Sequence, residues 1–509
     1  MQNQIIKSTV ILSISSIFAK FLGIFFRWPL VMLIGDEGIG YYQMTYPLYM
    51  FFVGIASGMP IAVSKLVSER SIHDDREGIY NIIKSAFKIM IILGLSCSLL
   101  LLIFSKRIIE ILKWDNKVYL SLIGMAISPI CVCVLGVFRG LFQGFEDMVP
   151  TGISQIIEQI SRVLFGISLA FLFFPMGIEY SAGGASFGGA IGGLIASAFM
   201  ILTYFKFRKN YFHKVRIKKS NKYFLKILKM CVPLSLGATV STIMVLIDSI
   251  LVPRMLLNAG FGYRESTILY GQLTGKVSVL INVPLTLSIA LGVSIIPALS
   301  KLHALKHKSK FKEKVVLSLK ISSIISFPCF IALYFLSSPI MNVIFPNNSE
   351  GFEILKYASI SIPFIIYCQI TTSILQSTNN YIIPVINLLI GCFLKILITL
   401  MLTGTLKFNI YGAVLATIFS YVLTSYLNLK SINRKLNIRI NILEIIISPL
   451  LSSLVMIIIV LLSFDFIYKI IGNILISLGI CSFIGIIIYG IMMIIFKRKE
   501  ISEIFLSIK

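Results

Sequence analysis

Two basic residues lie within the apolar segment 8–34. Lys20 and Arg27 are seven residues apart, and because each helical residue turns by about 100°, their side chains would lie within about 20° of one face. The same face carries small and polar residues, namely Ser13, Ser16 and Gly23. Pro29 favours a kink just beyond them. Since an ionisable group in a membrane helix normally faces a cavity or a partner, this pattern predicts a cavity wall.

A second polar face occurs in the segment 150–174. It carries polar residues at helical spacing, namely Gln155, Glu158, Gln159 and Arg162. Glu158 and Arg162 are four residues apart, so one interpretation is an ion pair whose members neutralise each other. In the other interpretation, Glu158 is a cavity acid and Arg162 binds substrate.

Four further charged residues fall in or near apolar segments. Lys65 and Arg139 lie near cytoplasmic segment ends, where they either line the cavity or reach the lipid headgroups. Lys276 is a cavity candidate inside its segment. Asp248 has no basic neighbour three or four residues away, which leaves it freer to bind a proton or cation. Lys395 is assigned no role, because it can snorkel toward a membrane surface.

The candidate cations outnumber the acids. Six basic side chains stand against Glu158 and Asp248, a balance of +4. A cationic cavity implies an anionic ligand, since Arg can grip phosphate oxygens bidentately while Lys adds a mobile point charge. The apolar outer faces offer a lipid tail a place to remain while its head crosses. A diphosphate-linked lipid therefore fits this cavity, whereas an organic cation does not.

Membrane-spanning helices must position these residues. Of the 509 residues, 57% are hydrophobic and 13% charged, a composition that a soluble protein of this length could hardly keep in solution. We predict an all-α membrane protein with about fourteen spans of roughly 20 residues or more. They are 8–34, 44–64, 84–105, 118–140, 150–174, 183–206, 224–252, 268–297, 316–336, 354–376, 381–403, 409–430, 441–463 and 470–496.

The distribution of basic residues indicates the orientation of the spans. The net charge is +25, and eight Lys or Arg residues fall in 206–222, six in 301–314 and four in 430–439. Cytoplasmic loops of membrane proteins carry such an excess, so we predict that these loops and both termini are cytoplasmic in a multi-pass protein of the cell membrane. Anionic lipids are then the expected partners of the loops. The charge consequently indicates topology and not a nucleic-acid partner.

Other kinds of chemistry find little support. No hydrophilic stretch is long enough to form a separate catalytic core, so we expect no enzyme activity. The eight cysteines lie in apolar segments without a CxxC pair, and the four histidines fall in predicted cytoplasmic loops. We therefore expect no resident cofactor or metal, while coupling to protons or sodium stays open. The N-terminal segment has no cleavage site of a signal peptide and is predicted to be retained.

Short patterns recur along the chain. Tyr-x-Gln-x-Thr at 41–45 returns at 270–274, and Ala-x-Ser-Lys-Leu at 62–66 returns at 298–302, which are offsets of 229 and 236 residues. Such repeats are typical of transporters built from two related halves. We predict a six-helix lobe at 1–206, a basic cytoplasmic linker at 207–223, a second six-helix lobe at 224–430 and two additional spans at 431–509.

Longer motifs carry a family resemblance. They are GDEGIGYYQM at 35–44, VSKLVSE at 63–69, RGLFQG at 139–144, PTGISQIIEQISR at 150–162 and YGQLTG at 270–275. Together they resemble the stage V sporulation protein B family. That family belongs to the polysaccharide exporter branch of the multidrug/oligosaccharidyl-lipid/polysaccharide transporters and is related to MurJ-type lipid II flippases. The resemblance implies two lobes around a central cavity, alternating access and a part in making spore cortex peptidoglycan.

The resemblance also implies residue roles. Lipid II flippases hold the diphosphate with basic residues of the first, second and eighth spans. These roles would fall here on Lys20, Arg27, Lys65 and Lys276, with Arg27 displaced by about one residue. Some relatives bind sodium through an Asp of the seventh span, with Asn and acidic groups of the eleventh and twelfth. Asp248 and Asn387 match that pattern, whereas the twelfth span of this chain has no acid.

Three functions compete. The first is a flippase for a lipid-linked polyprenyl diphosphate precursor of the cell wall or of a polysaccharide. The second is a cation-coupled multidrug exporter, which would want a cavity of net acidic character. The third is a non-transporting scaffold whose basic loops recruit enzymes of peptidoglycan synthesis. The balance of +4 among the intramembrane charges favours the first.

The topology can be tested by labelling. In a cysteine-free background, single cysteines placed in 206–222 or 301–314 should not react with an impermeant thiol reagent in intact cells, because both loops are expected to be cytoplasmic. The same cysteines should react after permeabilisation, which is the control. Efficient labelling of intact cells would contradict the orientation.

Overall fold

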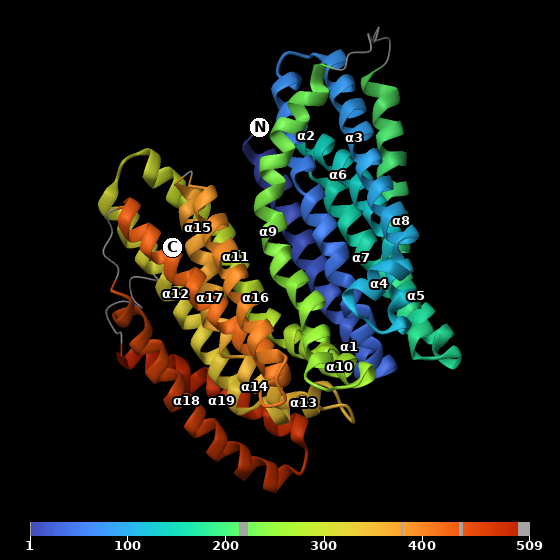
Figure 1. Ribbon diagram of the computed structural model, residues 1–509. Helices are drawn as coiled ribbons and strands as arrows, with labels where there is room; N and C mark the ends of the chain where they lie inside the picture. The colour runs from blue at the N-terminus through green and yellow to red at the C-terminus, as the bar shows by residue number, and fades with distance from the viewer. Residues whose placement is uncertain (1, 213–221, 379, 437–440, 497–509) are drawn as a thin grey trace. The chain divides into compact units, whose positions relative to one another are not determined.

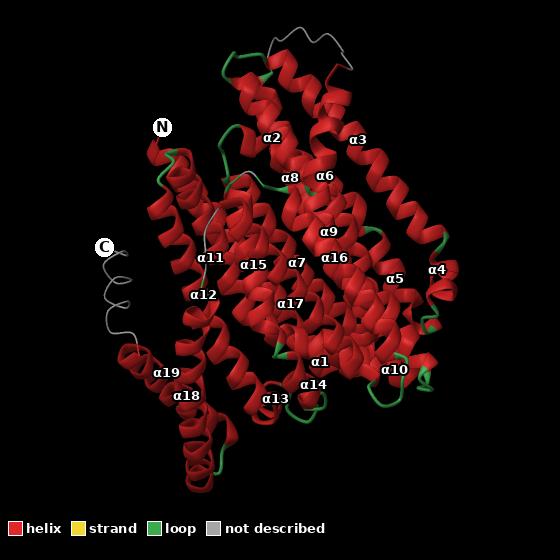
Figure 2. Ribbon diagram, turned by 60° about the vertical axis from the view of Figure 1, so that its left-hand side comes forward, coloured by secondary structure: helices red, strands yellow, loops and turns green. Residues whose placement is uncertain are grey.

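A computed structural model describes residues 2–212, 222–378, 380–436 and 441–496. The described residues form helices and connecting loops without a strand, which confirms the all-α prediction (Figure 2). The chain divides into two compact units, Met1–Gly271 and Gln272–Lys509.

The first unit runs from blue to green in Figure 1. Its helical segments are α1 (Gln2–Ala56), α2 (Gly58–Ser71), α3 (Arg76–Ile103), α4 (Ser105–Leu112), η1 (Asn116–Val118), α5 (Tyr119–Ala126), α6 (Ser128–Gly144), α7 (Val149–Phe173), η2 (Phe174–Met176), α8 (Ile178–Tyr211), α9 (Lys222–Asn258) and α10 (Tyr263–Gly271).

The second unit continues from green through yellow to red, and it contains two π-helical segments, η3 and η4. Its segments are η3 (Gln272–Val277), α11 (Ser278–Ala304), α12 (Lys308–Phe335), α13 (Ser337–Ile344), α14 (Phe352–Ala358), α15 (Ser361–Ser377), α16 (Ile382–Ile398), η4 (Thr399–Thr403), α17 (Asn409–Leu436), α18 (Ile442–Ile471) and α19 (Ile474–Phe496).

The helix α1 is broken at Gly35, which adopts φ 64° and ψ −170°. A side chain at this position would meet no atom within 4 Å, so the backbone conformation and not space calls for glycine. The two arms fold back on each other, since the Phe26 and Tyr42 rings are 6.0 Å apart. The sequence favoured a kink at Pro29, but the break lies at Gly35, and it separates the first two predicted spans.

Glycines let α7 and α8 pack closely. The buried glycines of α8 are Gly183, Gly184, Gly188, Gly189, Gly192 and Gly193. A Cβ atom on Gly192 would lie 2.6 Å from the carbonyl oxygen of Glu158 and 3.0 Å from the backbone nitrogen of Arg162. Bare backbone on α8 therefore allows the polar face of α7 to be buried against it.

The apolar core of the first unit forms where α2, α3, α6, α8 and α9 meet. Its most buried side chains include Met59, Leu66, Ile79, Leu141 and Ile227. In addition, the hydroxyl of Ser235 on α9 donates a hydrogen bond to the carbonyl oxygen of Ile55, at 2.6 Å, and accepts one from the backbone N–H of Gly58, at 3.1 Å. These contacts fix α9 against the junction of α1 and α2.

The second unit has two apolar clusters. One joins α11, α12, α15, α17 and α18 around residues such as Leu319 and Ile374, and the other joins α12, α18 and α19 around Ile457 and Cys481. The hydroxyl of Tyr489 on α19 also donates to the carbonyl oxygen of Ile324, at 3.0 Å. The last two helices are thus packed onto α12.

Eleven helical runs of the described residues are long and apolar enough to cross a membrane, or twelve if the bent pair α14 and α15 forms one span. One of these runs, Phe21–Ser71, covers the later part of the predicted span 8–34 and the whole of 44–64. The predicted span 224–252 coincides with α9, which is not among the eleven. Each predicted span thus coincides with helix, but the number fourteen stays a prediction.

Along the chain, the boundary between the two compact units falls within the helical run Tyr263–Ala304. The sequence placed the boundary between its lobes earlier, in the linker 207–223, whose residues 213–221 lie outside the described part of the chain. Both α9 and α10 pack with the first unit. The division into repeated lobes therefore stays a prediction.

The close packing of α7 and α8 makes a testable prediction. The substitution Gly192→Ala should lower the melting temperature, because its methyl group would force apart backbones that are in contact, at a cost of about 1–3 kcal/mol. Thermal unfolding of the purified protein measures the effect. Gly490→Ala on α19 is the matched control, since a Cβ atom there meets nothing within 4 Å. Equal melting temperatures for the two variants would contradict the packing argument.

Candidate functional site

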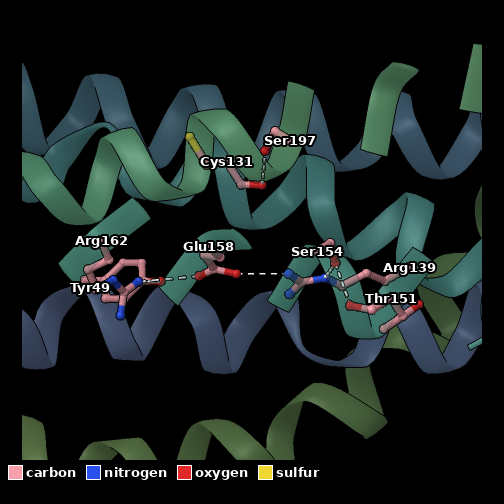
Figure 3. A network of polar contacts seen from close by, with 8 residues as sticks. All are labelled: Tyr49, Cys131, Arg139, Thr151, Ser154, Glu158, Arg162 and Ser197. Atoms are coloured by element: carbon pink, nitrogen blue, oxygen red, sulfur yellow. Dashed lines mark hydrogen bonds and ion pairs between the residues drawn. The ribbon is translucent and has the colours of Figure 1, made fainter. Parts of the chain in front are cut away.

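A carboxylate shared by two arginines lies inside the first unit (Figure 3). Glu158 on α7 accepts from Arg139 on α6 at 2.9 Å and from Arg162, one turn along α7, at 3.4 Å. The side chains of Glu158 and Arg162 are only 11% and 10% exposed. The predicted ion pair between Glu158 and Arg162 is therefore confirmed, and Arg139 joins it from another helix.

Neighbouring polar groups complete the arrangement. The Nε of Arg139 donates to the hydroxyl of Ser154 at 2.9 Å, and that hydroxyl donates to the carbonyl oxygen of Thr151 at 2.7 Å. An Nη of Arg162 donates to the hydroxyl of Tyr49 on α1 at 3.2 Å (Figure 3). The triad of Arg139, Glu158 and Arg162 thus connects α1, α6 and α7.

The triad carries a net positive charge, because two guanidinium groups share one carboxylate. Burial of an ion is costly, and it is tolerated where a partner and hydrogen bonds compensate it. Glu158 provides this compensation for both cations, which leaves the carboxylate engaged on both oxygens. Its contacts are those of a counter-ion to Arg139 and Arg162.

Three tyrosines on the second arm of α1 form what we term the tyrosine ladder, Tyr42, Tyr46 and Tyr49. The ring centroids of Tyr42 and Tyr46 are 5.7 Å apart, and those of Tyr46 and Tyr49 are 5.9 Å apart. The guanidinium of Arg162 lies 5.7 Å from the Tyr49 centroid, and that of Arg27 lies 5.5 Å from the Tyr46 centroid. The fold therefore brings Arg27 and Arg162, two of the candidate substrate-binding residues, to the same tyrosine ladder.

Lys276 is fully buried in the second unit, within η3. Its ammonium donates to the backbone oxygen of Asn348 at 2.8 Å and to the side-chain oxygen of the same residue at 3.1 Å. It also lies 5.9 Å from the ring centroid of Phe345. The described contacts of Lys276 thus join the π-helical segment to the loop that follows α13.

Asn387 belongs to a neutral buried network. Its amide donates to the side-chain oxygen of Asn428 on α17 at 2.9 Å. Asn428 in turn donates to the hydroxyls of Thr371 and Thr372 on α15, at 3.1 and 3.2 Å. Asp248 lies partly buried on α9 of the first unit. The sodium-binding role that the resemblance implied for Asp248 and Asn387 stays a prediction.

Three other basic residues differ in their exposure. Lys65 is exposed on α2. Lys20 lies in α1, but its side chain is outside what the structure describes. Lys395 is 2% exposed, so it is buried in α16 and does not snorkel to a surface.

One charged cluster escaped the sequence analysis. Glu37, which lies between the predicted spans 8–34 and 44–64, is 7% exposed just beyond the break of α1. It accepts from Arg264 on α10 at 2.8 Å and from the hydroxyl of Tyr41 at 2.8 Å, and Lys117 approaches to 3.9 Å. The sequence did contain a signal for the tyrosine ladder, because its three residues are spaced four and three apart, which puts them on one helix face. It contained no signal for the contact between Glu37 and Arg264, which are 227 residues apart.

The described residues contain no group of three His, Cys, Asp or Glu side chains that could hold a metal ion. The chemistry available at the triad and the ladder is therefore that of guanidinium groups, one carboxylate and aromatic faces. Such groups bind anions and cations.

Comparison with known proteins identifies relatives of this chain. Residues 5–303 match the family described as polysaccharide biosynthesis protein. The chain is 26% identical to stage V sporulation protein B of Bacillus subtilis (strain 168) over 451 residues, which cover 86% of this chain and 85% of that protein. It is 24% identical to lipid II flippase MurJ of the same organism over 450 residues, which cover 83% and 81%.

Solved structures share the fold. A lipid II flippase MurJ in an inward closed conformation aligns with a TM-score of 0.75 at 20% identity, covering 97% of this chain and 100% of that one. An inward-facing multidrug resistance MATE transporter of the MOP superfamily aligns with a TM-score of 0.67 at 14% identity, covering 84% and 99%. The apolar helices and these relatives identify a multi-pass membrane protein with a MOP-type transporter fold.

The shared carboxylate makes a prediction about stability. Glu158→Gln should lower the free energy of unfolding by about 3–5 kcal/mol, because it leaves two largely buried cations without a counter-ion. Chemical or thermal unfolding of the purified protein measures the change. Glu110→Gln is the matched control, since Glu110 pairs with Arg107 on the surface and should matter little. If both variants unfold alike, the triad does not stabilise the fold.

Proposed function

This chain belongs to the polysaccharide biosynthesis protein family, and from that premise we propose that it is a flippase for a lipid-linked precursor. The substrate would be a polyprenyl diphosphate that carries a cell-wall or polysaccharide unit. The likeness to stage V sporulation protein B and to lipid II flippase MurJ supports this class. We propose that the precursor is used in the synthesis of spore cortex peptidoglycan. The principal partner is then the lipid-linked anionic substrate.

The observation that carries the proposal is the placement of Arg27. This residue is partly exposed within an apolar helical run, and its guanidinium rests over the Tyr46 ring at 5.5 Å. The neighbouring carboxylate, Glu158, is occupied by Arg139 and Arg162. The region therefore keeps a positive excess, which suits an anionic headgroup.

We assign the diphosphate to Arg27 and Lys20 together, because their spacing puts them on one helix face. The planar guanidinium of Arg27 can form two parallel hydrogen bonds with diphosphate oxygens, and Lys20 would add a point charge. Lys65 and Lys276 are further proposed contacts of the diphosphate, and Lys276, which is buried and donates to Asn348, would have to leave these oxygens first. Arg139 and Arg162 contribute to the positive potential from their paired positions.

We propose that transport proceeds by alternating access of two six-helix lobes, 1–206 and 224–430, with both termini in the cytoplasm. We assign coupling to a proton or a sodium ion to Asp248, which lies within an apolar stretch of α9. Asn387 would contribute its side-chain oxygen, because its amide nitrogen already donates to Asn428.

A cation-coupled multidrug exporter is the second candidate, and the shared fold of the MATE transporter favours it. Drug cations would require an acidic site. Glu158 offers little to such a ligand, because Arg139 and Arg162 lie within 2.9 and 3.4 Å of its oxygens. A non-transporting scaffold for peptidoglycan synthesis enzymes needs no substrate site at Arg27 and Lys20. This third function therefore predicts that the protein binds no lipid-linked substrate.

Substitution of the two basic residues of the first span tests the proposal. Arg27→Lys keeps the charge but loses the planar fork, so binding and transport of lipid II should fall, whereas Lys20→Arg should be milder. Alanine at either position should weaken binding by about 1.5–3 kcal/mol, the range for a hydrogen bond to a charged group. Lipid II binding and transport by the purified protein in vesicles measure these effects.

The melting temperature of the same four variants serves as the control. A substrate-binding role predicts lost binding with little change in melting. Unchanged binding with a lowered melting temperature would instead assign both residues to helix anchoring and remove them from the site.

A further inference from the structure

Two arginines from different helical segments contact neighbouring rungs of the tyrosine ladder. Arg27, on the first arm of α1, lies over Tyr46, and Arg162, on α7, lies over Tyr49. The two rings are 5.9 Å apart at an interplanar angle of 52°. Through these contacts Arg162 and Arg27 are connected by two aromatic rings.

Arg162 is poorly placed to bind substrate itself. The residue is 8% exposed, its guanidinium is engaged by Glu158 and the Tyr49 hydroxyl, and the Tyr49 ring covers one face. A lipid diphosphate would have to displace these partners to reach it. Arg27 and Tyr46, in contrast, are both partly exposed.

The Tyr49 ring is held firmly. Its hydroxyl accepts the hydrogen bond from Arg162 at 3.2 Å, and Arg162 is anchored by Glu158, which Arg139 holds from α6. Close packing against Gly192 of α8 fixes the backbone of α7 at Glu158 and Arg162. A linked set of polar contacts in a low-dielectric region is rigid, so Tyr49 limits the positions available to Tyr46.

We propose that Arg162 and Tyr49 are positioning residues that set the orientation of the Arg27 guanidinium through Tyr46. The proposal rests on the proposed function, in which Arg27 grips a diphosphate. The cation–π attraction favours positions of the guanidinium over the Tyr46 ring, and a guanidinium restricted in this way loses less entropy when it forms a two-point grip. The ladder therefore favours a lipid diphosphate, whose two phosphate groups can meet Arg27 and Lys20 together, over a lipid monophosphate, which has a single phosphate group.

The experiment compares the two lipids directly. Full-length protein in nanodiscs is titrated with undecaprenyl diphosphate and with undecaprenyl monophosphate, and the ratio of the two dissociation constants is the readout. Tyr46→Leu removes the ring under Arg27, so the preference for diphosphate should fall by about threefold to tenfold. Tyr46→Phe keeps the aromatic face and should keep the preference.

Tyr49→Phe provides a second variant of nearly unchanged shape. It removes only the hydroxyl that Arg162 binds, so it should reduce the preference by a smaller factor while the protein still folds. Tyr119→Leu is the matched control, because it removes another cation–π contact of the first unit, that with Lys106 at 5.8 Å, outside the ladder. It should leave the ratio unchanged.

The outcomes separate the two proposals. If the wild-type protein binds neither lipid, the proposed function fails. If it binds both equally, or if Tyr46→Leu and Tyr49→Phe keep the wild-type ratio, the ladder does not position Arg27 and the present inference is overturned. A purely structural role predicts that both affinities and the melting temperature fall together at a constant ratio, which would overturn it as well.

Discussion

The arrangement of the first unit depends on one carboxylate that serves two guanidinium groups in an apolar helical bundle. A buried arginine without a partner would be costly in a membrane, and Glu158 makes the burial of both Arg139 and Arg162 tolerable. Because the three charges come from α6 and α7, and Arg162 also donates to Tyr49 of α1, the ion pairs specify how three helices pack. The glycines of α8 then allow α7 to be covered without a gap.

The shared carboxylate distinguishes two kinds of basic residue, those paired with Glu158 and those that are not. Arg139 and Arg162 are engaged by Glu158, which compensates their burial, and together they leave a positive local potential. Arg27 is partly exposed on the facing arm of α1 and rests on an aromatic ring. In the proposed function, a substrate phosphate would meet a guanidinium whose surroundings are already ordered, which would lower the entropic cost of binding.

The second unit handles its polar groups differently. Lys276 is compensated by the oxygens of Asn348, and the amides of Asn387 and Asn428 satisfy each other and nearby hydroxyls. The network of Asn387 and Asn428 is neutral, so it connects its helices without the desolvation cost of charge. Lys395 is buried in the same unit, where a charged lysine is tolerated only with partners.

The sequence alone determined the membrane class and predicted spans that coincide with helix, because hydropathy is a local property of a helix. The spacing of four residues offered the pair of Glu158 and Arg162 as one of two interpretations. Only the tertiary structure decided that Arg139 completes the triad, that Lys276 meets a loop 72 residues away and that Lys395 is buried and does not snorkel. Helical periodicity states which residues share a face. It does not state which neighbouring helix covers that face, since that choice depends on glycine contacts and on the break at Gly35, through which distant segments meet.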